Sequence, residues 1–208
     1  MKKEHIEASL FNLYAASFCE PQKELADNLL ILETLESLQG ELNARFTEFK
    51  SLKETFLQYD LQSLLIDYTR VFIGPFHVIA YPYSSVYFSN GVKTLYNETT
   101  AWVEGFYRTC GFSFQNTVKD MPDHIAVELE FLYTLKFKIN TLLQEGNFES
   151  AQRLEQLYAE FIKNHFSIWV PRLCGKVIDE ANGTYYAELC KWLHGFITYC
   201  IIPTITVE

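Results

Sequence analysis

The segment Asp67–Phe88 constrains the fold of this chain most strongly, because a helical pattern stops there and a dense aromatic stretch follows. Before the break, apolar residues recur at three- and four-residue spacing, which predicts an amphipathic helix; they are Leu61, Leu64, Leu65, Tyr68 and Phe72. Gly74 can adopt the left-handed conformation that closes a helix, and Pro75 removes a backbone donor. The helix is therefore expected to end at this pair.

The residues that follow the break are too apolar to form a solvated loop. They are Phe76, Val78, Ile79, Tyr81, Tyr83, Val86, Tyr87 and Phe88. Pro82 restricts the backbone between Tyr81 and Tyr83, so the rings are held at low entropic cost. We therefore expect a rigid aromatic ledge between helices, made of Phe72, Tyr81, Tyr83 and Tyr87. Such rings can equally form core, and only an open edge would accept an apolar peptide.

Helical periodicity continues along the rest of the chain, with breaks at glycine or proline. The expected helices are residues 4–19, 23–38, 42–59, 61–73, 93–110, 122–145, 148–163, 169–181 and 184–200. Asp60 is expected to cap the fourth of them, and Pro171 to lie in the first turn of the eighth. No strand-like alternation is long enough to build a sheet. The sequence predicts a single all-α domain, a helical bundle, over residues 1–208.

Composition limits the partners that this chain can have. Its 208 residues are 49% hydrophobic, which is enough for a substantial core. Seventeen basic and 26 acidic residues give a net charge of −9, which argues against a nucleic-acid backbone or an anionic membrane surface. The negative charge suits a cationic partner, or simply keeps the protein soluble.

The chain lacks targeting and redox signals. The residues after Lys3 follow an amphipathic helix pattern rather than that of a secretory signal, and no apolar run would span a bilayer. A soluble, cytoplasmic protein is therefore expected. The five cysteines are scattered without a Cys-x-x-Cys pair, so they are expected to be buried free thiols in a reducing cytoplasm.

The usual enzyme signatures are missing from the sequence. It has no phosphate-binding glycine loop, no dinucleotide fingerprint and no nucleophile elbow. His124 and Glu128 lie one helical turn apart, with Glu130 close by. One alternative is therefore a metal-dependent hydrolase that uses His124, Glu128 and Glu130; another is a general helical adaptor. We expect a protein that is not an enzyme and holds no metal or cofactor.

The Asp123-His124 pair has two interpretations. With Asp120 as N-cap, Asp123 falls in the first turn of a helix, where a carboxylate satisfies backbone donors and complements the helix dipole. Alternatively, Asp123 offers its charge to an arginine, with His124 donating or accepting beside it. A carboxylate at a helix start is expected to be partly exposed, so both interpretations can hold together.

Two elements of the sequence resemble a known family. The first contains Tyr68, Phe72, Gly74, Pro75, Tyr81, Pro82, Tyr83, Ser85 and Tyr87, and the second is the stretch Met121–Phe131, in which Pro-Asp-His opens a long helix. In this order they resemble the TorD/DmsD family of cytoplasmic redox-enzyme maturation chaperones. Weaker similarity extends to His165, Trp169, Pro171 and the Tyr185-Tyr186 pair. Val71 and Tyr83 depart from the family pattern.

The resemblance implies a TorD-like helical bundle and a chaperone role. Such a protein would bind the twin-arginine leader and the apo form of a molybdopterin oxidoreductase subunit, assisting cofactor insertion and delaying export. The leader-binding residues it implies are Phe72, Gly74, Pro75, Tyr81, Pro82, Tyr83, Ser85, Tyr87, Asp123 and His124. We expect no nucleic-acid partner and no membrane insertion. The chain would be a monomer or a helix-exchanged dimer with Phe112–Met121 as hinge, and the client and any guanine-nucleotide binding are left open.

Overall fold

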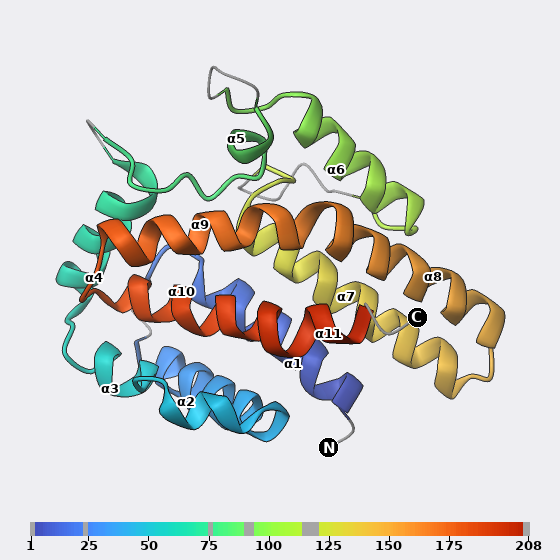
Figure 1. The fold of residues 1–208 in the computed structure, drawn as a ribbon, viewed down its shortest axis with the longest axis horizontal. Helices are drawn as coiled ribbons and strands as arrows, with labels where there is room; N and C mark the ends of the chain where they lie inside the picture. The colour runs from blue at the N-terminus through green and yellow to red at the C-terminus, as the bar shows by residue number, and fades with distance from the viewer. Residues whose placement is uncertain (1–2, 23–24, 75–76, 90–93, 114–120, 206–208) are drawn as a thin grey trace. The chain divides into compact units, whose positions relative to one another are not determined.

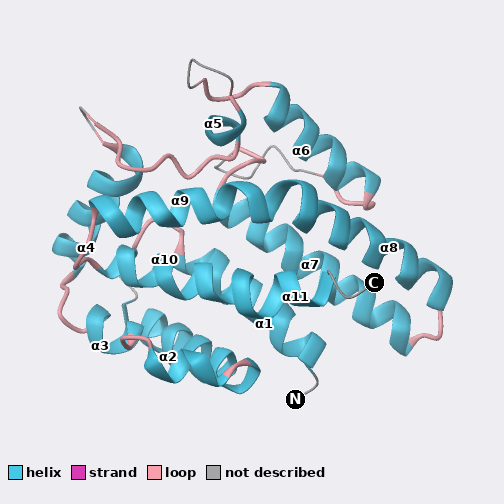
Figure 2. Cartoon of the chain, viewed as in Figure 1, coloured by secondary structure: helices cyan, strands magenta, loops and turns pink. Residues whose placement is uncertain are grey.

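The computed structural model describes residues 3–22, 25–74, 77–89, 94–113 and 121–205. Within these ranges the chain is helical or irregular, and the only β pairing is an isolated bridge between Tyr83 and His124 (Figures 1 and 2). The helices are α1 Lys3–Ser17, α2 Leu25–Leu42, α3 Leu52–Phe56, α4 Leu61–Tyr68, α5 Ser85–Phe88, α6 Glu98–Thr109, α7 Ile125–Gln144, α8 Phe148–Phe161, α9 Ser167–Glu180, α10 Tyr185–Phe196 and α11 Ile202–Ile205. The predicted all-α class is confirmed.

The chain divides into two compact units. Unit 1 comprises Met1–Ala15 and Tyr83–Trp169, and unit 2 comprises Ala16–Pro82 and Val170–Glu208. Helices α1 and α9 contribute residues to both units. A single domain over residues 1–208 stays a prediction.

Unit 1 is built on the antiparallel pair α7 and α8, which lie side by side (Figure 1). The turn between them has Gly146 at φ 76°, followed by Asn147, whose side chain accepts a hydrogen bond from the Ser150 amide at 3.3 Å. The sequence predicted this break, and the prediction is confirmed. Glu7 of α1 forms an ion pair with Lys136 of α7, 3.3 Å apart and almost fully buried.

An aromatic core joins α6 to the α7–α8 pair. The rings of Tyr107 and Phe131 lie 4.3 Å apart, and Phe161 contacts Phe106 at 5.2 Å and Phe131 at 5.1 Å. Pairs of this kind stabilise a core beyond the area that they bury.

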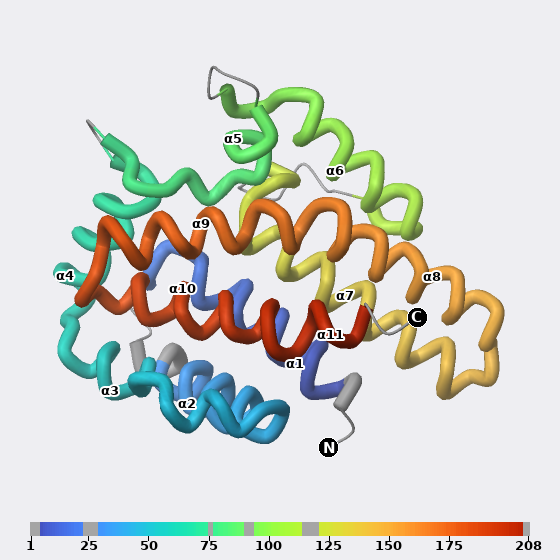
Figure 3. Tube along the Cα trace, in the orientation of Figure 1, coloured from blue at the N-terminus to red at the C-terminus, as the bar shows by residue number. Residues whose placement is uncertain are grey.

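Unit 2 has α10 at its centre, in contact with α3 and α4. Trp192 of α10 stacks on Phe46, and its indole nitrogen donates to the Lys50 carbonyl at 2.9 Å. Gln39, fully buried, donates its side-chain amide to the Trp192 carbonyl at 2.9 Å. Figure 3 traces α10 running on through a π-helical turn, Ile197–Ile201, into α11.

The single helix expected over residues 42–59 is wrong. The chain forms a 3-10 helix, Ala44–Glu48, and then α3. Asn43 accepts a hydrogen bond from the Arg45 amide at 3.1 Å, and Ser51 accepts one from the Glu54 amide at 3.1 Å. Short polar side chains that bond nearby backbone amides compete with a continuous helix.

The expected break between residues 163 and 169 is also wrong. Helix α8 passes through a π-helical turn, Ile162–Phe166, directly into α9, and Pro171 lies inside α9. Proline in a helix interior costs roughly 3 kcal/mol. The surrounding face of α9 is fully buried at Trp169, Val170 and Leu173. Burying each such side chain contributes roughly 1.5–3 kcal/mol, which offsets that cost.

Four of the cysteines, Cys110, Cys174, Cys190 and Cys200, are buried free thiols as expected, but Cys19 is exposed. The expectation of burial is therefore wrong for Cys19, which lies just beyond the end of α1. Across the described ranges, every helix is too short or too polar to cross a membrane.

Gly74 ends the helical segment of α4 as predicted. Its φ is 48°, and its amide donates to the Thr69 carbonyl at 2.6 Å across the π-helical turn Thr69–Ile73. A Cβ placed on Gly74 would lie 2.7 Å from the His77 carbonyl carbon and 2.9 Å from the Val78 nitrogen. The chain therefore needs glycine here for both its conformation and its space.

We expect Gly74→Ala to lower the free energy of unfolding by more than about 2 kcal/mol, because positive φ and backbone overlap add. Gly146→Ala is the matched control, since Gly146 also has positive φ but a Cβ there would meet nothing within 4 Å. It should cost about 1 kcal/mol. Urea unfolding of both variants checks this, and equal losses would contradict the close approach at Gly74.

Candidate functional site

In unit 1, the entry to α5 is tied to the start of α7 through Asp123. The Ser84 amide donates to the Asp123 carbonyl at 2.9 Å, and the Ser85 amide donates to its carboxylate Oδ2 at 3.0 Å. We call this pair of hydrogen bonds the Asp123 clamp. The preceding residue is held as well, because the Tyr107 hydroxyl donates to the Pro122 carbonyl at 2.8 Å.

His124 is the N-cap of α7. Its Nδ1 accepts a hydrogen bond from the Ala126 amide at 3.2 Å, and its ring meets the Tyr83 ring edge to face at 5.0 Å. Helix α7 therefore begins at Ile125, three residues later than the sequence predicted. The cap expected at Asp120 lies outside the described residues.

The expected partial exposure of Asp123 is wrong, because the residue is fully buried and His124 is only 3% exposed. Ser85 is also fully buried, whereas Tyr83 and Tyr87 are half-buried. The Tyr87 ring lies 5.6 Å from that of Trp169. Of the predicted site residues in unit 1, only the two tyrosines therefore reach the surface of the described structure.

The predicted site residues of unit 2 belong partly to its core. Phe72 is 4% exposed, and its ring contacts those of Tyr68 and Tyr186 at 5.3 Å each. Tyr81 is half-buried and Pro82 is buried, while Pro75 lies outside the described residues. The Ala80 amide donates to the Val71 carbonyl at 2.9 Å, so the segment leading to Tyr81 is fixed against the helix that precedes it.

A buried network that the sequence did not predict lies beneath α5. Glu128 of α7 is fully buried, and its carboxylate bonds His165 Nε2 at 2.8 Å and Trp169 Nε1 at 2.9 Å. The Phe88 ring of α5 stacks on the His165 ring at 5.1 Å. Burial raises the pKa of Glu128 above its ordinary value, and the bonds from His165 and Trp169 oppose this. No local pattern could predict contacts between residues so distant in sequence.

The residues of the hydrolase alternative, His124, Glu128 and Glu130, do not form one site in the described structure. Glu128 is engaged by His165 and Trp169, His124 caps α7, and Glu130 is exposed. Within the described part of the chain, no three His, Cys, Asp or Glu side chains gather as a metal would require. The residues expected to share one site thus have three different environments.

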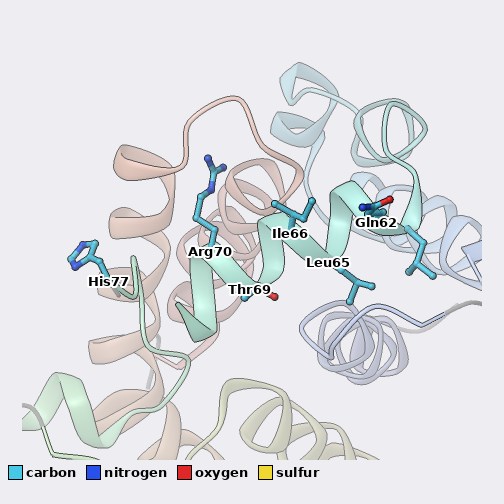
Figure 4. Close-up of a pocket in the computed structure, with 7 residues that line it drawn as sticks. Gln62, Leu65, Ile66, Thr69, Arg70 and His77 are labelled. Carbon is cyan, nitrogen blue, oxygen red and sulfur yellow. The ribbon is translucent and has the colours of Figure 1, made fainter. Parts of the chain in front are cut away.

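A second surface missed by the sequence analysis is an apolar groove on α4, of about 800 Å³. It is lined by Leu61, Gln62, Leu65, Ile66, Thr69, Arg70 and His77. Figure 4 shows Ile66 of α4 and Arg70 of the π-helical turn that follows it projecting to one side of the backbone, and Leu65 projecting to the other. Leu64 and Tyr68 bury the inner face of α4, yet Ile66 is 59% exposed. A helix that is apolar on two faces is typical of one that meets a partner.

Known proteins resemble this chain over most of its length. The family model described as nitrate reductase delta subunit matches residues 12–175. The TorD chaperone of Vibrio atlanticus is 28% identical over 181 residues, which is 86% of this chain and 70% of that protein. The TorD chaperone of Vibrio parahaemolyticus is 28% identical over 134 residues. This match covers 64% of this chain but only 60% of the length of that relative.

One solved structure shares the fold. It is a crystal structure from Archaeoglobus fulgidus, described as a candidate redox enzyme maturation protein, with a TM-score of 0.58 and 22% identity. The match covers 95% of this chain and 94% of that one. At this identity the likeness concerns the fold alone.

We expect Glu128→Leu to lower the free energy of unfolding by about 2–4 kcal/mol, because it leaves buried donors of His165 and Trp169 without an acceptor. Glu128→Gln retains an oxygen for Trp169, and its amide can donate to His165 in the other tautomer. The glutamine variant should therefore lose less than half as much. Urea unfolding at pH 7 measures both changes, and equal losses would contradict the proposed roles of the two carboxylate oxygens.

The pH dependence provides a control for that prediction. Because the pKa of Glu128 is raised in the folded protein, the folded state binds the proton more tightly than the unfolded state. The free energy of unfolding of the parent should therefore fall relative to that of Glu128→Gln as the pH rises. The fall should begin near pH 4.5, the ordinary pKa of glutamate, and end once the pH passes the raised pKa of Glu128. A difference independent of pH would contradict the raised pKa.

Proposed function

Since this chain belongs to the nitrate reductase delta subunit family of TorD-type chaperones, we propose that it is a cytoplasmic chaperone for a redox enzyme. It binds the twin-arginine leader and the apo form of a molybdopterin oxidoreductase subunit. Occupancy of the leader delays export until the cofactor is inserted, which requires no catalytic residue in the chaperone. The molybdenum cofactor would belong to the client subunit, and no residue of this chain is proposed to hold it.

The observation that carries this proposal is the pair of half-buried tyrosines, Tyr83 and Tyr87, held by buried neighbours. Tyr83 packs on His124, and Tyr87 packs on Trp169. A ring fixed in this way loses little entropy when a peptide binds to it. The accessible part of a half-buried tyrosine ring supplies apolar contact, and a tyrosine hydroxyl can hydrogen-bond a peptide backbone group.

Arginine recognition is proposed to use the faces of these rings. A guanidinium is planar, weakly hydrated and stacks on tyrosine, whereas a lysine ammonium is a compact, strongly hydrated charge. The net charge of −9 favours approach of a cationic leader from solution. This route needs no exposed carboxylate at the ledge, and it is therefore compatible with the burial of Asp123.

The apolar segment of the leader is proposed to lie in the groove on α4. Signal sequences carry about 7–15 apolar residues after their positive residues, a helix of about 10–22 Å. The groove runs from Leu61 to Arg70, which is about 14 Å along a helix. Arg70 and His77 lie at one end of the lining (Figure 4).

We expect a twin-arginine leader peptide to bind at least about tenfold more tightly than the same peptide with twin lysine, because a planar, weakly hydrated guanidinium stacks on a ring at a smaller desolvation cost than a compact ammonium. Isothermal titration of the purified chain with the two peptides measures the ratio. Equal affinities would indicate a general apolar adaptor, and absence of binding by either peptide would remove the proposed function.

We expect Ile66→Asp to weaken leader binding by about tenfold, because a charge would enter an apolar contact that the leader buries. Leu30→Asp on α2 is the matched control, since Leu30 is 66% exposed, similar to Ile66, and lies outside the groove lining. Its affinity should equal that of the parent. If both variants bind alike, the apolar segment lies elsewhere.

A further inference from the structure

We infer that Asp123 serves leader binding by positioning α5 and its tyrosine, and not by contacting an arginine of the leader. The inference rests on the proposed function and concerns the same site. It assigns a different role to an acidic residue whose place in the sequence suggested a counter-ion.

The carboxylate of Asp123 replaces a helix cap that α5 lacks. Ser84 is the N-cap residue of α5, but its side chain makes no capping hydrogen bond. The first amide of α5, that of Ser85, instead donates to Asp123 Oδ2, 38 residues away in sequence. Negative charge and an acceptor at this end of a helix are both stabilising. A four-residue helix cannot persist without such outside support.

The second bond of the clamp fixes the direction of entry. Because Ser84 and Ser85 donate to one residue, two successive amides are held at 2.9 and 3.0 Å from Asp123. Tyr83 precedes this pair and Tyr87 follows it within α5. The isolated bridge between Tyr83 and His124 continues the same attachment by one residue. The clamp therefore determines where both half-buried rings lie.

The surroundings of Asp123 disfavour direct contact with a ligand. The residue is fully buried, and its neighbours Pro122 and His124 are engaged by Tyr107 and by the α7 backbone. Its second oxygen, Oδ1, is buried and makes no hydrogen bond among the described residues. A guanidinium could reach that oxygen only if the groups that bury it moved.

Substitution by asparagine separates the two roles. Asp123→Asn keeps an oxygen acceptor for the Ser85 amide but removes the negative charge, whereas Asp123→Ala removes both. Glu130→Gln, which removes one charge from an exposed position on α7, is the control for net charge. Titration with the twin-arginine leader peptide and hydrogen exchange at the Ser85 amide are measured on the parent and each variant.

The expected result is that Asp123→Ala binds the leader at least about tenfold more weakly than the parent, with faster exchange at Ser85, because the cap is lost. Asp123→Asn should remain within about threefold of the parent, with slow exchange. If the asparagine variant binds as weakly as the alanine variant while Ser85 stays protected, the charge contacts the leader and the inference is overturned. Parent-like binding by Asp123→Ala also overturns it.

Titration of the parent protein distinguishes failure of the proposed function from failure of the positioning role of Asp123. Absence of leader binding by the parent would remove the proposed function and this inference with it. Normal binding by the parent with equal losses in both variants would remove only the positioning role. If Asp123→Ala does not fold, the comparison of Asp123→Asn with the parent still decides, because only a charge contact predicts a large loss there.

Discussion

Two hydrogen bonds to Asp123, one to its main chain and one to its side chain, hold the segment of unit 1 that presents the half-buried rings of Tyr83 and Tyr87. They hold successive amides at the entry to α5, a helix too short to form alone. The stacking of Phe88 on His165 and of Tyr87 near Trp169 requires that α5 lie where this clamp places it. Removing the clamp would leave buried amides without acceptors, so the interaction is costly to break.

The segment from Ala80 to Ser85 is held by one hydrogen bond in unit 2 and by the two hydrogen bonds of the Asp123 clamp in unit 1. At its start, the Ala80 amide bonds the Val71 carbonyl after the glycine break, and at its finish Ser84 and Ser85 bond Asp123. The proline between these ends restricts the backbone further. Such a segment can present half-buried tyrosines to a peptide with little loss of entropy, which supports recognition by preorganisation.

The sequence allowed prediction of features that depend on local chemistry. The break at Gly74, the turn at Gly146 and the cap at Asp60, which accepts from the Ser63 amide at 2.8 Å, all follow from single residues. The continuous helix through the π-helical turn Ile162–Phe166 could not be predicted in this way. Pro171 is typical of a helix start, and it is tolerated inside α9 only because burial of the surrounding helix face outweighs its cost.

The candidate site was predicted only in part because burial depends on contacts across the chain. Asp123 and His124 were identified as a pair at a helix start, but the sequence could not show that the carboxylate would be buried and would accept from the Ser85 amide. Likewise Glu128 was paired with His124 one turn away, whereas its partner is His165 on another helical segment. The groove on α4 was missed because Leu61 and Leu65 were assigned to the buried stripe, and Ile66, which lies outside that stripe, was not considered.

The most direct test of the account is a crystal structure of the chain bound to a twin-arginine leader peptide. The account predicts an arginine side chain stacked on Tyr83 or Tyr87, with the Ser84 and Ser85 amides still bonded to Asp123. A complex in which α5 has left its place and a leader guanidinium bonds the Asp123 carboxylate would contradict it.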